Sequence, residues 1–337
     1  MAMNPRHRRL LFPGLLLALL IVVVVSALAN KADAAASPDA AGPGRVSQLT
    51  DPRITESSGL VVSRDHDDLV YTINDSGNDS LVFAVQLSTG KTVGTATPDR
   101  DFVDAEALSI DSESTLWVAD TGDNNRVRSD VALYAFAEPG PRDAAVATTR
   151  YPLVYPEGPR DVEALVIDPR TDAKFLLTKG LLGGEVFALP EPLKADQPNR
   201  VTAVDATVPG MMTDAAFTPD GRHVVARNYV KASVLDAETW KSVGSVRLPA
   251  VKQGETLAME PAGTSFLVGS EGADSPIDRV ALTQPSAEQT TPSPATTRKP
   301  SPEPIGGGNG FAGSTWLWAS VAVALLAAVA VLANRRR

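Results

Sequence analysis

Five copies of one short pattern run along the sequence, and each begins with a polar turn that leads into an apolar strand. A tight turn and a second apolar strand follow. The copies start at Glu56, Asp104, Asp161, Thr213 and Gln253, and the Leu or Phe at their fifth position recurs at spacings of 48, 57, 52 and 40 residues. Repeats of this length predict small units that bury their apolar faces only by packing against one another.

Each unit is read as four strands. Third strands are visible at positions such as Leu81–Val85, and fourth strands follow less clearly near 92–97, 149–155, 200–207 and 242–248. Short strands with regularly spaced turn signals and no helical period predict an all-β fold. We therefore expect a β-propeller of about five four-stranded blades over residues 44–284, or six if an irregular stretch hides a degenerate blade. A pair of β-sandwiches is the alternative, but it does not explain the repetition.

The last unit lacks a clear fourth strand after Val280. The segment Arg45–Leu49, upstream of the first unit, has strand character and no partner of its own. If this segment completes the last blade, the ring closes and no unpaired edge remains.

The N-terminus carries the features of a secretory signal. Basic residues at positions 6–9 precede an apolar run from Leu10 to Val25 and a small-x-small site at 26–29. We predict a signal peptide at 1–29 and a flexible tether at 30–43, with an uncleaved anchor helix as the alternative for the first segment.

The C-terminus is predicted to anchor the chain in a membrane. A Pro/Ser/Thr/Gly-rich stalk at 285–310 leads to an uncharged stretch at 311–333 that contains Trp316 and Trp318, and a basic tail at 334–337 follows. These features predict a transmembrane helix with a cytoplasmic tail. The expected protein is a single-pass protein of the cell membrane with its propeller on the extracellular side.

Composition excludes several classes of function. The chain has no cysteine and three histidines, which argues against disulfide frameworks, thiolate zinc sites and a Ser–His–Asp centre. Without the two terminal arginine clusters, 25 basic residues face 40 acidic ones, a formal charge of −15. Such a domain repels nucleic acid, so no nucleic-acid partner is expected.

Carboxylates recur where the first strand of each unit begins, near one mouth of the expected channel. Residues i and i+2 point to the same side of a strand, so paired acids there can converge. The candidate metal ligands are Glu56, Asp104, Glu106, Asp161, Glu163, Asp214 and Glu255. A ring of oxygen ligands suits calcium, which is the candidate cofactor. The alternative is that these acids have a structural role and only form hydrogen bonds to neighbouring loops.

Polar residues also follow the second strands, at the same expected mouth. The candidate ligand-binding residues are Asp75, Asp120, Asp123, Asn124, Lys179, Arg227 and Glu271. The two cations either neutralise the acids without any metal or hold an anionic ligand beside a bound cation.

The chain resembles a group of exported bacterial β-propeller proteins described as WD-repeat-like or NHL-like. The motifs that carry the resemblance are Glu56–Leu60, Asn74–Gly77 and Asp161–Leu165. This group has no settled biochemical function, and the resemblance covers about residues 50–282. The chain is more distantly similar to calcium-dependent propeller hydrolases of the lactonase and phytase type. That likeness implies a metal site at Asp104, Glu106, Asp161, Glu163 and Glu255. The histidines that some lactonases use have no counterpart here.

Two functions are therefore carried forward. The first is a binding module at the cell envelope, whose partner outside the membrane is a protein or a small-molecule ligand that the sequence does not identify. The alternative is a calcium-dependent hydrolase of the esterase, lactonase or phosphoesterase type that uses the carboxylates at the channel mouth.

Overall fold

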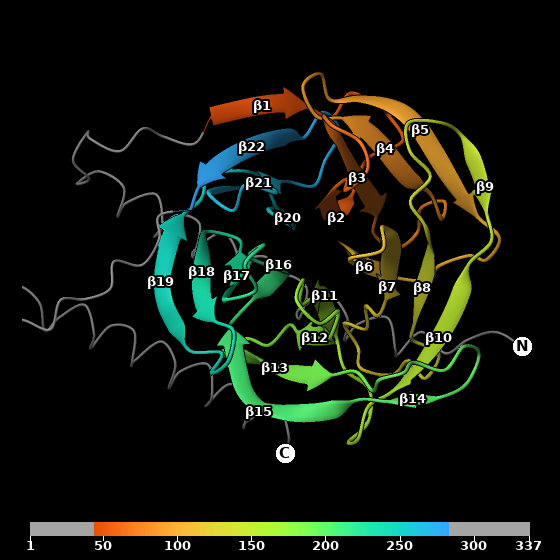
Figure 1. Cartoon of the computed structure of the whole chain (residues 1–337), viewed down its shortest axis with the longest axis vertical. Helices are drawn as coiled ribbons and strands as arrows, with labels where there is room; N and C mark the ends of the chain where they lie inside the picture. The colour runs from red at the N-terminus through yellow and green to blue at the C-terminus, as the bar shows by residue number, and fades with distance from the viewer. Residues whose placement is uncertain (1–43, 283–337) are drawn as a thin grey trace, which may run out of the picture. The chain divides into compact units, whose positions relative to one another are not determined.

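The computed structural model describes residues 44–282, which contain 22 β-strands in five sheets. The predicted signal peptide, tether, stalk, transmembrane helix and basic tail lie outside the described residues. Within 44–282, no helix is long and apolar enough to cross a membrane. The sheets are arranged around one axis as the blades of a propeller, and the predicted all-β, five-bladed architecture is confirmed (Figure 1).

The first three blades follow one another along the chain, each starting with its innermost strand. Blade 1 is β2 (Ser57–Val62), β3 (Leu69–Asn74), β4 (Val82–Gln86) and β5 (Lys91–Pro98). Blade 2 is β6 (Ala105–Ile110), β7 (Thr115–Asp120), β8 (Ala132–Ala137) and β10 (Thr149–Val154). Blade 3 is β11 (Val162–Ile167), β12 (Lys174–Thr178), β13 (Gly183–Ala188) and β15 (Thr202–Pro209).

Blades 4 and 5 complete the ring. Blade 4 is β16 (Met212–Phe217), β17 (His223–Asn228), β18 (Lys231–Asp236) and β19 (Ser242–Arg247). Blade 5 takes its three inner strands from the C-terminal part of the described chain: β20 (Thr256–Met259), β21 (Ser265–Gly269) and β22 (Pro276–Ala281). Its outermost strand is β1 (Gly44–Gln48), from the opposite end of the described chain.

The pairing of β1 with β22 closes the propeller. It is antiparallel and matches Gly44 with Arg279 and Gln48 with Pro276. Arg45 Nε donates to Asp278 Oδ1 over 2.6 Å, and Leu49, just after β1, is 2% exposed. The prediction that the segment at 45–49 supplies the missing strand is confirmed.

Two short strands join neighbouring blades along their outer edges. β9 (Ala144–Val146), in the connection between β8 and β10, pairs in parallel with β5 of blade 1. β14 (Asn199–Arg200), in the connection between β13 and β15, pairs in parallel with β10 of blade 2. These additions cover edges that would otherwise offer unpaired backbone groups.

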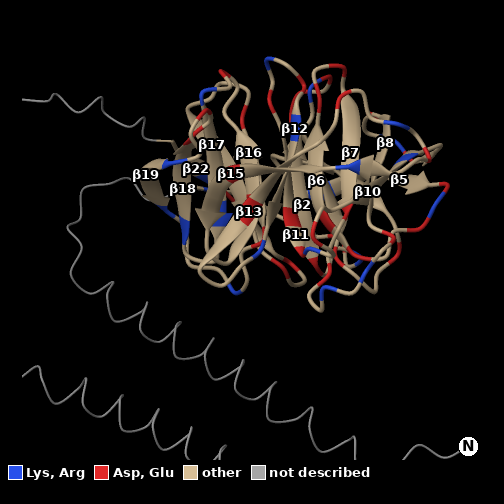
Figure 2. Ribbon diagram, turned by 90° about the horizontal axis from the view of Figure 1, so that it is seen from below, with Lys and Arg blue, Asp and Glu red and all other residues tan. Residues whose placement is uncertain are grey.

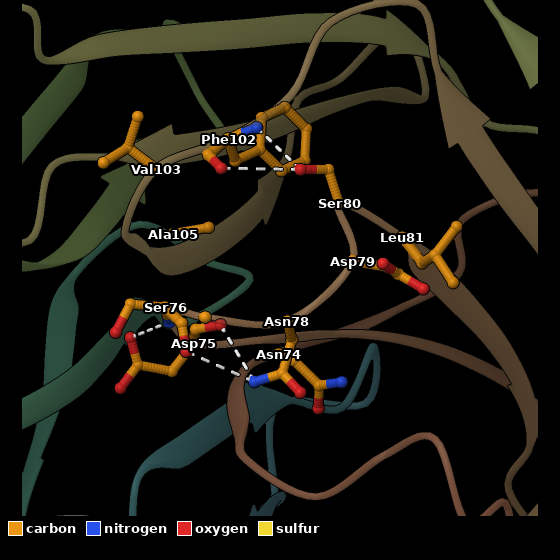
Figure 3. Close-up of a pocket in the computed structure, with 11 residues that line it drawn as sticks. Asn74, Asp75, Ser76, Asn78, Asp79, Ser80, Leu81, Phe102, Val103 and Ala105 are labelled. Atoms are coloured by element: carbon orange, nitrogen blue, oxygen red, sulfur yellow. Dashed lines mark hydrogen bonds between the residues drawn. The ribbon is translucent and has the colours of Figure 1, made fainter.

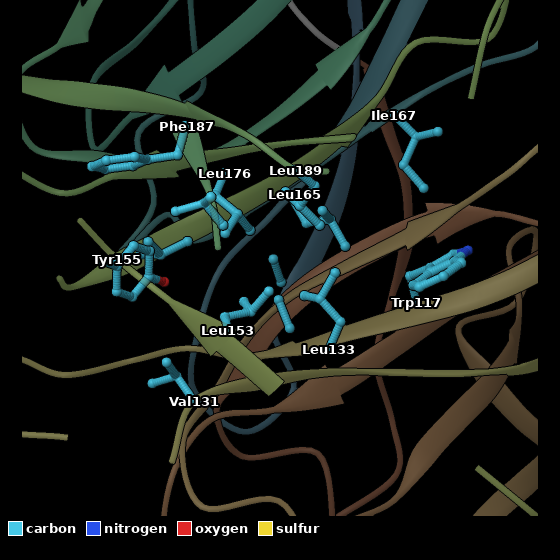
Figure 4. Packing of buried hydrophobic residues seen from close by; sticks show 14 of the residues in the cluster. Trp117, Val131, Leu133, Leu153, Tyr155, Leu165, Ile167, Leu176, Phe187 and Leu189 are labelled. Carbon is cyan, nitrogen blue, oxygen red and sulfur yellow. The ribbon is translucent and has the colours of Figure 1, made fainter. Parts of the chain in front are cut away.

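The apolar core is divided into five clusters, one between each pair of adjacent blades. The cluster between blades 2 and 3 contains Trp117, Leu133, Leu165 and Phe187 (Figure 4). Because alternate residues of a strand face opposite sides, each blade supplies both of its neighbours. In β3, Tyr71 packs toward blade 2 and Val70 toward blade 5. Each interface therefore depends on both blades that form it.

Four of the five innermost strands carry a β-bulge near their start, where the register with the second strand shifts. The bulged residues are Ser58, Glu106, Glu163 and Thr213. This register corrects the repeat alignment in blade 4, where Thr213 matches Ser58 and not Glu56. The equivalent stretch begins at Met211, two residues earlier than the sequence pattern indicated. A shift of two residues preserves the alternation of faces, so the apolar pattern alone does not detect it.

We predict that deletion of residues 44–48 strongly destabilises the protein, because β22 then has no partner and the ring is open. The expected fall in melting temperature is about 10 °C or more, with aggregation through the exposed edge. The matched control is deletion of residues 39–43, an equal length from the predicted tether. Equal melting temperatures for the two deletions, measured by circular dichroism, would show that closure by β1 is dispensable.

Candidate functional site

Three carboxylates converge at the end of the ring where the innermost strands begin, which we call the acidic end. Asp75 follows β3, Asp104 precedes β6, and Glu106 is the bulged residue of β6. One oxygen from each lies within 4.8 Å of the others. Two oxygens that bind one Ca²⁺ at 2.3–2.6 Å are separated by no more than about 5 Å, so this spacing suits a single hard cation. These three residues are called the carboxylate cluster below.

Backbone and side-chain contacts hold the cluster in place. The bulge in β6 re-aims Glu106, as bulges beside active sites commonly do. Glu106 Oε2 accepts a hydrogen bond of 3.0 Å from Ser58 Oγ, the equivalent bulged residue of blade 1. Asp120 accepts the backbone N–H of Asp104 over 2.9 Å and pairs with Arg128 over 2.8 Å. Asp120, a predicted ligand-binding residue, is thus engaged in fixing the loop that carries Asp104.

Gly122 leaves the space that the carboxylate cluster occupies. A Cβ atom at this position would lie 2.5 Å from Asp104 Cγ and 2.6 Å from Glu106 Oε1. Any side chain here would push the two carboxylates apart or block the point on which they converge. The absence of a side chain at residue 122 therefore lets the carboxylates of Asp104 and Glu106 come together.

Burial and mutual repulsion disfavour the ionised forms of these acids. Burial, together with the contact to Asp75, raises the pKa of Asp104 to about 7. Burial and the nearby Glu163, Asp75 and Asp104 raise the pKa of Glu106 well above its usual range. The cluster therefore needs either a retained proton or a cation to be stable near neutral pH. A metal ion relieves the repulsion without protonation.

A cationic group lies beside the cluster. Lys179 Nζ pairs with Glu163 Oε2 over 2.9 Å and lies 5.9 Å from the centre of the Tyr229 ring. Burial favours the neutral amine, but Glu163, Tyr229 and Glu255 raise the pKa of Lys179 above its usual range. The ammonium is close enough to the cluster to lower the pKa of Glu106. Lys179 is therefore a permanent positive charge at the acidic end.

Glu163 keeps one carboxylate oxygen unused. The residue is 1% exposed, and its Oε1 atom has no hydrogen-bond partner among residues 44–282. Burial raises the pKa of Glu163 to about 8, although Lys179 limits the rise. A buried carboxylate oxygen without a partner is costly unless it serves a ligand or exchanges a proton.

Blade 5 contributes two further acids to this end. Glu255 is 5% exposed and accepts a hydrogen bond of 3.2 Å from Gln253 Nε2, and burial raises its pKa. Burial, with Glu255 and Asp75 nearby, raises the pKa of Glu271 to about 7. The acidic end thus gathers carboxylates from blades 1, 2, 3 and 5.

Two predicted site residues contact the backbone of blade 5 from blade 4 and do not belong to the carboxylate cluster. Arg227, 1% exposed, donates through Nη1 to Thr256 O over 2.8 Å and to Gly269 O over 3.0 Å. Asp214 accepts the backbone N–H of Leu257 over 2.6 Å. Both side chains lie on strand faces that point toward blade 5. The sequence pattern did not indicate this, because its alignment of the fourth repeat is offset by two residues. Arg227 therefore compensates buried acids from within the ring and is not placed to meet a ligand.

The remaining predicted residues organise loops. Asp161 Oδ1 accepts the backbone N–H of Asp123 over 2.9 Å, and Asp123 in turn accepts the N–H groups of its own loop. Glu56 accepts a hydrogen bond of 2.5 Å from Asn78 Nδ2, and Asn124 is exposed. Of these four, Asn124 alone presents its side chain to solvent; the others support the loops that carry the site.

The loop after β3 also encloses a small cavity of about 10 Å³, on the order of one water molecule. Its lining includes Asp75 and Asn78, and Ser80 Oγ accepts the backbone N–H of Phe102 over 2.7 Å (Figure 3). These contacts join the loop of blade 1 to the loop that enters β6. They bring Asp75 toward the carboxylates of blade 2.

The opposite end of the ring differs in character. The last residue of each innermost strand lines a cavity of about 320 Å³ there, and these residues are Val62, Ile110, Ile167, Phe217 and Met259. Acidic segments occur along the loops at both ends of the ring and inside it on β11 (Figure 2). The carboxylates of Asp75, Asp104 and Glu106 nevertheless converge at the acidic end.

Sequence reasoning missed Tyr229, Ser58 and the steric role of Gly122. Tyr229 follows β17 at the position that Asp75 occupies after β3, so a correct alignment of the fourth repeat identifies it. Ser58 is the bulged residue of blade 1 and is equivalent to Glu106 and Glu163. Because serine is uncharged, it does not belong to the acidic pattern that is visible in the sequence.

No protein-family model matches the sequence, and no curated protein matches it. The structure is similar to a gluconolactonase from Xanthomonas campestris, with 9% identity, a TM-score of 0.44, and coverage of 67% of this chain and 72% of that one. It is also similar to glutaminyl cyclase from Myxococcus xanthus, with 11% identity, a TM-score of 0.47, and coverage of 72% and 97%. A luciferin-regenerating enzyme matches with 8% identity, a TM-score of 0.41, and coverage of 68% and 78%. These likenesses concern the β-propeller architecture alone.

We predict that the metal-free protein loses stability as the pH rises from about 5.5 to 8. A carboxyl group whose folded pKa is raised favours folding below its unfolded pKa, and that contribution is lost as the pH rises through the folded pKa, about 7 for Asp104. Calcium should raise the melting temperature at pH 8 by about 5–10 °C at a hundredfold excess over its dissociation constant. Glu106→Gln should abolish that rise.

The matched control is Glu157→Gln, since the Glu157 side chain is 81% exposed and lies outside the carboxylate cluster. Thermal unfolding in calcium and in chelator, at both pH values, measures all the shifts. If calcium leaves the parent protein unchanged at pH 8, the carboxylate cluster does not bind it.

Proposed function

We propose that this protein is a calcium-dependent hydrolase of ester or phosphoester bonds. The observation that carries this proposal is the convergence of Asp75, Asp104 and Glu106, two of which come together in the space left by Gly122. All of their donor atoms are carboxylate oxygens, which suit a hard cation such as calcium. The distant resemblance of the repeat motifs to calcium-dependent propeller hydrolases supports the same reading.

The chemistry of the site divides among three groups. When bound, the calcium ion supplies Lewis-acid polarisation of a carbonyl or phosphoryl oxygen. Lys179 directs its ammonium toward the negative charge that develops on that oxygen. Glu163 accepts a proton from the attacking water at Oε1, because this buried oxygen has no other partner among residues 44–282.

The pKa of Glu163, about 8, suits this proton transfer near neutral pH. The water oxygen bonds to the carbonyl carbon or phosphorus, the ester bond breaks, and the proton taken up by Glu163 passes to the departing alkoxide, which leaves as the alcohol. The ring of Tyr229, whose centre lies 5.9 Å from Lys179 Nζ, helps to orient the ammonium. The proximity of Lys179 and Glu163 to Glu106 supports these roles.

The sequence also predicts a non-catalytic binding module at the cell envelope, and the experiment below separates the two. The predicted address, an extracellular head on a membrane anchor, depends on residues outside the described part and stays a prediction. A hydrolase there would act on substrates outside the cell.

The test is hydrolysis of p-nitrophenyl acetate, p-nitrophenyl phosphate and γ-butyrolactone by the full chain, with calcium and with chelator. We expect calcium-dependent turnover of at least one of these compounds. Lys179→Met should lower kcat/KM by about a hundredfold or more, while Glu157→Gln should leave it unchanged. Circular dichroism verifies that the Lys179 variant is folded.

Absence of turnover for all three compounds, in a sample shown to bind calcium, would overturn the hydrolase proposal. The binding module that the sequence predicts would then be the better description of the protein. Turnover that persists undiminished in chelator would separate catalysis from the carboxylate cluster.

A further inference from the structure

Large apolar side chains are exposed at the acidic end far more than elsewhere on the propeller. Residues 44–282 contain seven exposed large hydrophobic residues, and five of them lie in loops at this end. These are Val103 (56% exposed), Val127 (74%), Leu181 (77%), Leu182 (96%) and Val230 (51%). We call this set the apolar rim. The other two, Val93 and Val243, lie on the outer strands β5 and β19.

Each member of the apolar rim is close in the chain to a residue of the site. Val103 precedes Asp104, and Val230 follows Tyr229. Leu181 and Leu182 come two and three residues after Lys179. Val127 precedes Arg128, which pairs with Asp120. The polar centre and its apolar border are therefore carried by the same loops.

The turn that presents Leu181 and Leu182 is tightly held. A Cβ at Gly180 would lie 2.0 Å from Gly183 O, and a Cβ at Gly210 would lie 2.5 Å from Leu181 O. Met211 N donates to Gly180 O over 2.8 Å. The two leucines are thus fixed in solvent by close backbone packing. Scattered apolar residues on a surface are ordinary, but two adjacent leucines held out at one site indicate a contact with a ligand.

We propose that the substrate is an amphiphile, an ester whose acyl group is an extended apolar chain that lies on Leu181 and Leu182. This inference rests on the proposed hydrolase function. The carboxylate cluster and Lys179 bind the ester group, while the apolar rim removes the apolar chain from water. The substrate itself covers the apolar rim, because the loops that carry the rim also carry the residues of the site.

The charge of this end argues against a lipid bilayer as the occupant. Without the two terminal arginine clusters, the chain carries a formal charge of −15, and an acidic surface of this kind repels anionic headgroups. A single amphiphilic molecule can place its ester group against Lys179 and its chain against the rim. A flat apolar surface cannot satisfy both.

The test compares p-nitrophenyl acetate, butyrate and octanoate as substrates of the full chain in calcium. The rim variant is Leu181→Ser with Leu182→Ser, and the matched control is Val93→Ser with Val243→Ser, which removes two exposed apolar side chains far from the site. We expect the ratio of kcat/KM for octanoate over acetate to fall about tenfold or more in the rim variant. The control variant should keep the parent ratio.

An unchanged ratio in the rim variant, or an equal fall in the control, would overturn the inference. If none of these esters is hydrolysed, binding of octylphosphonate and methylphosphonate is measured by calorimetry, which tests the amphiphilic ligand separately from the hydrolase proposal. Tighter binding of octylphosphonate that is lost in the rim variant would still support an amphiphilic ligand. Equal binding of the two phosphonates would overturn it, as would binding of phosphatidylcholine vesicles through the rim.

Discussion

The antiparallel pairing of β1 with β22 is the constraint on which the rest of the structure depends. It joins the two ends of the described chain into one blade, so that blade 5 packs against both blade 4 and blade 1. All five interfaces then bury an apolar cluster, and the innermost strands begin at one end of the ring. Without closure, nothing would hold the loops of blades 1, 2, 3 and 5 close enough for their carboxylates to converge.

The convergence of these carboxylates causes electrostatic repulsion, which the positive charges of the fold compensate only in part. Lys179 compensates Glu163 through an ion pair, and Arg227 compensates acids from between blades 4 and 5. Burial lowers the pKa of Arg227 to about 10, a sign of how completely this guanidinium is removed from water. Neither cation contacts the oxygens of Asp75 and Asp104, so a retained proton or a bound cation must supply the remaining charge.

Much of the fold follows from the sequence because the strand period and the turn signals recur in every repeat. Even the closing strand is predictable, since the last repeat lacks one strand and a spare segment stands upstream. The orientation of individual side chains is harder, because a bulge or a two-residue offset leaves the apolar alternation intact. Asp214 and Arg227 were therefore expected at the channel mouth, while Tyr229, which does face Lys179, was overlooked. Asp75, Asp104 and Glu106 were predictable as acids at one end, but their convergence depends on Gly122 and on the bulge in β6.

The central claim, that the carboxylate cluster binds a hard cation, is tested most directly by crystallography with an anomalous scatterer. Crystals soaked in Mn²⁺ or Tb³⁺ should show one strong anomalous peak about 2.2–2.5 Å from oxygens of Asp75, Asp104 and Glu106. The peak should be displaced by excess calcium. An occupied peak elsewhere with none at the cluster, or Lys179 Nζ lying among the three carboxylates, would contradict the account.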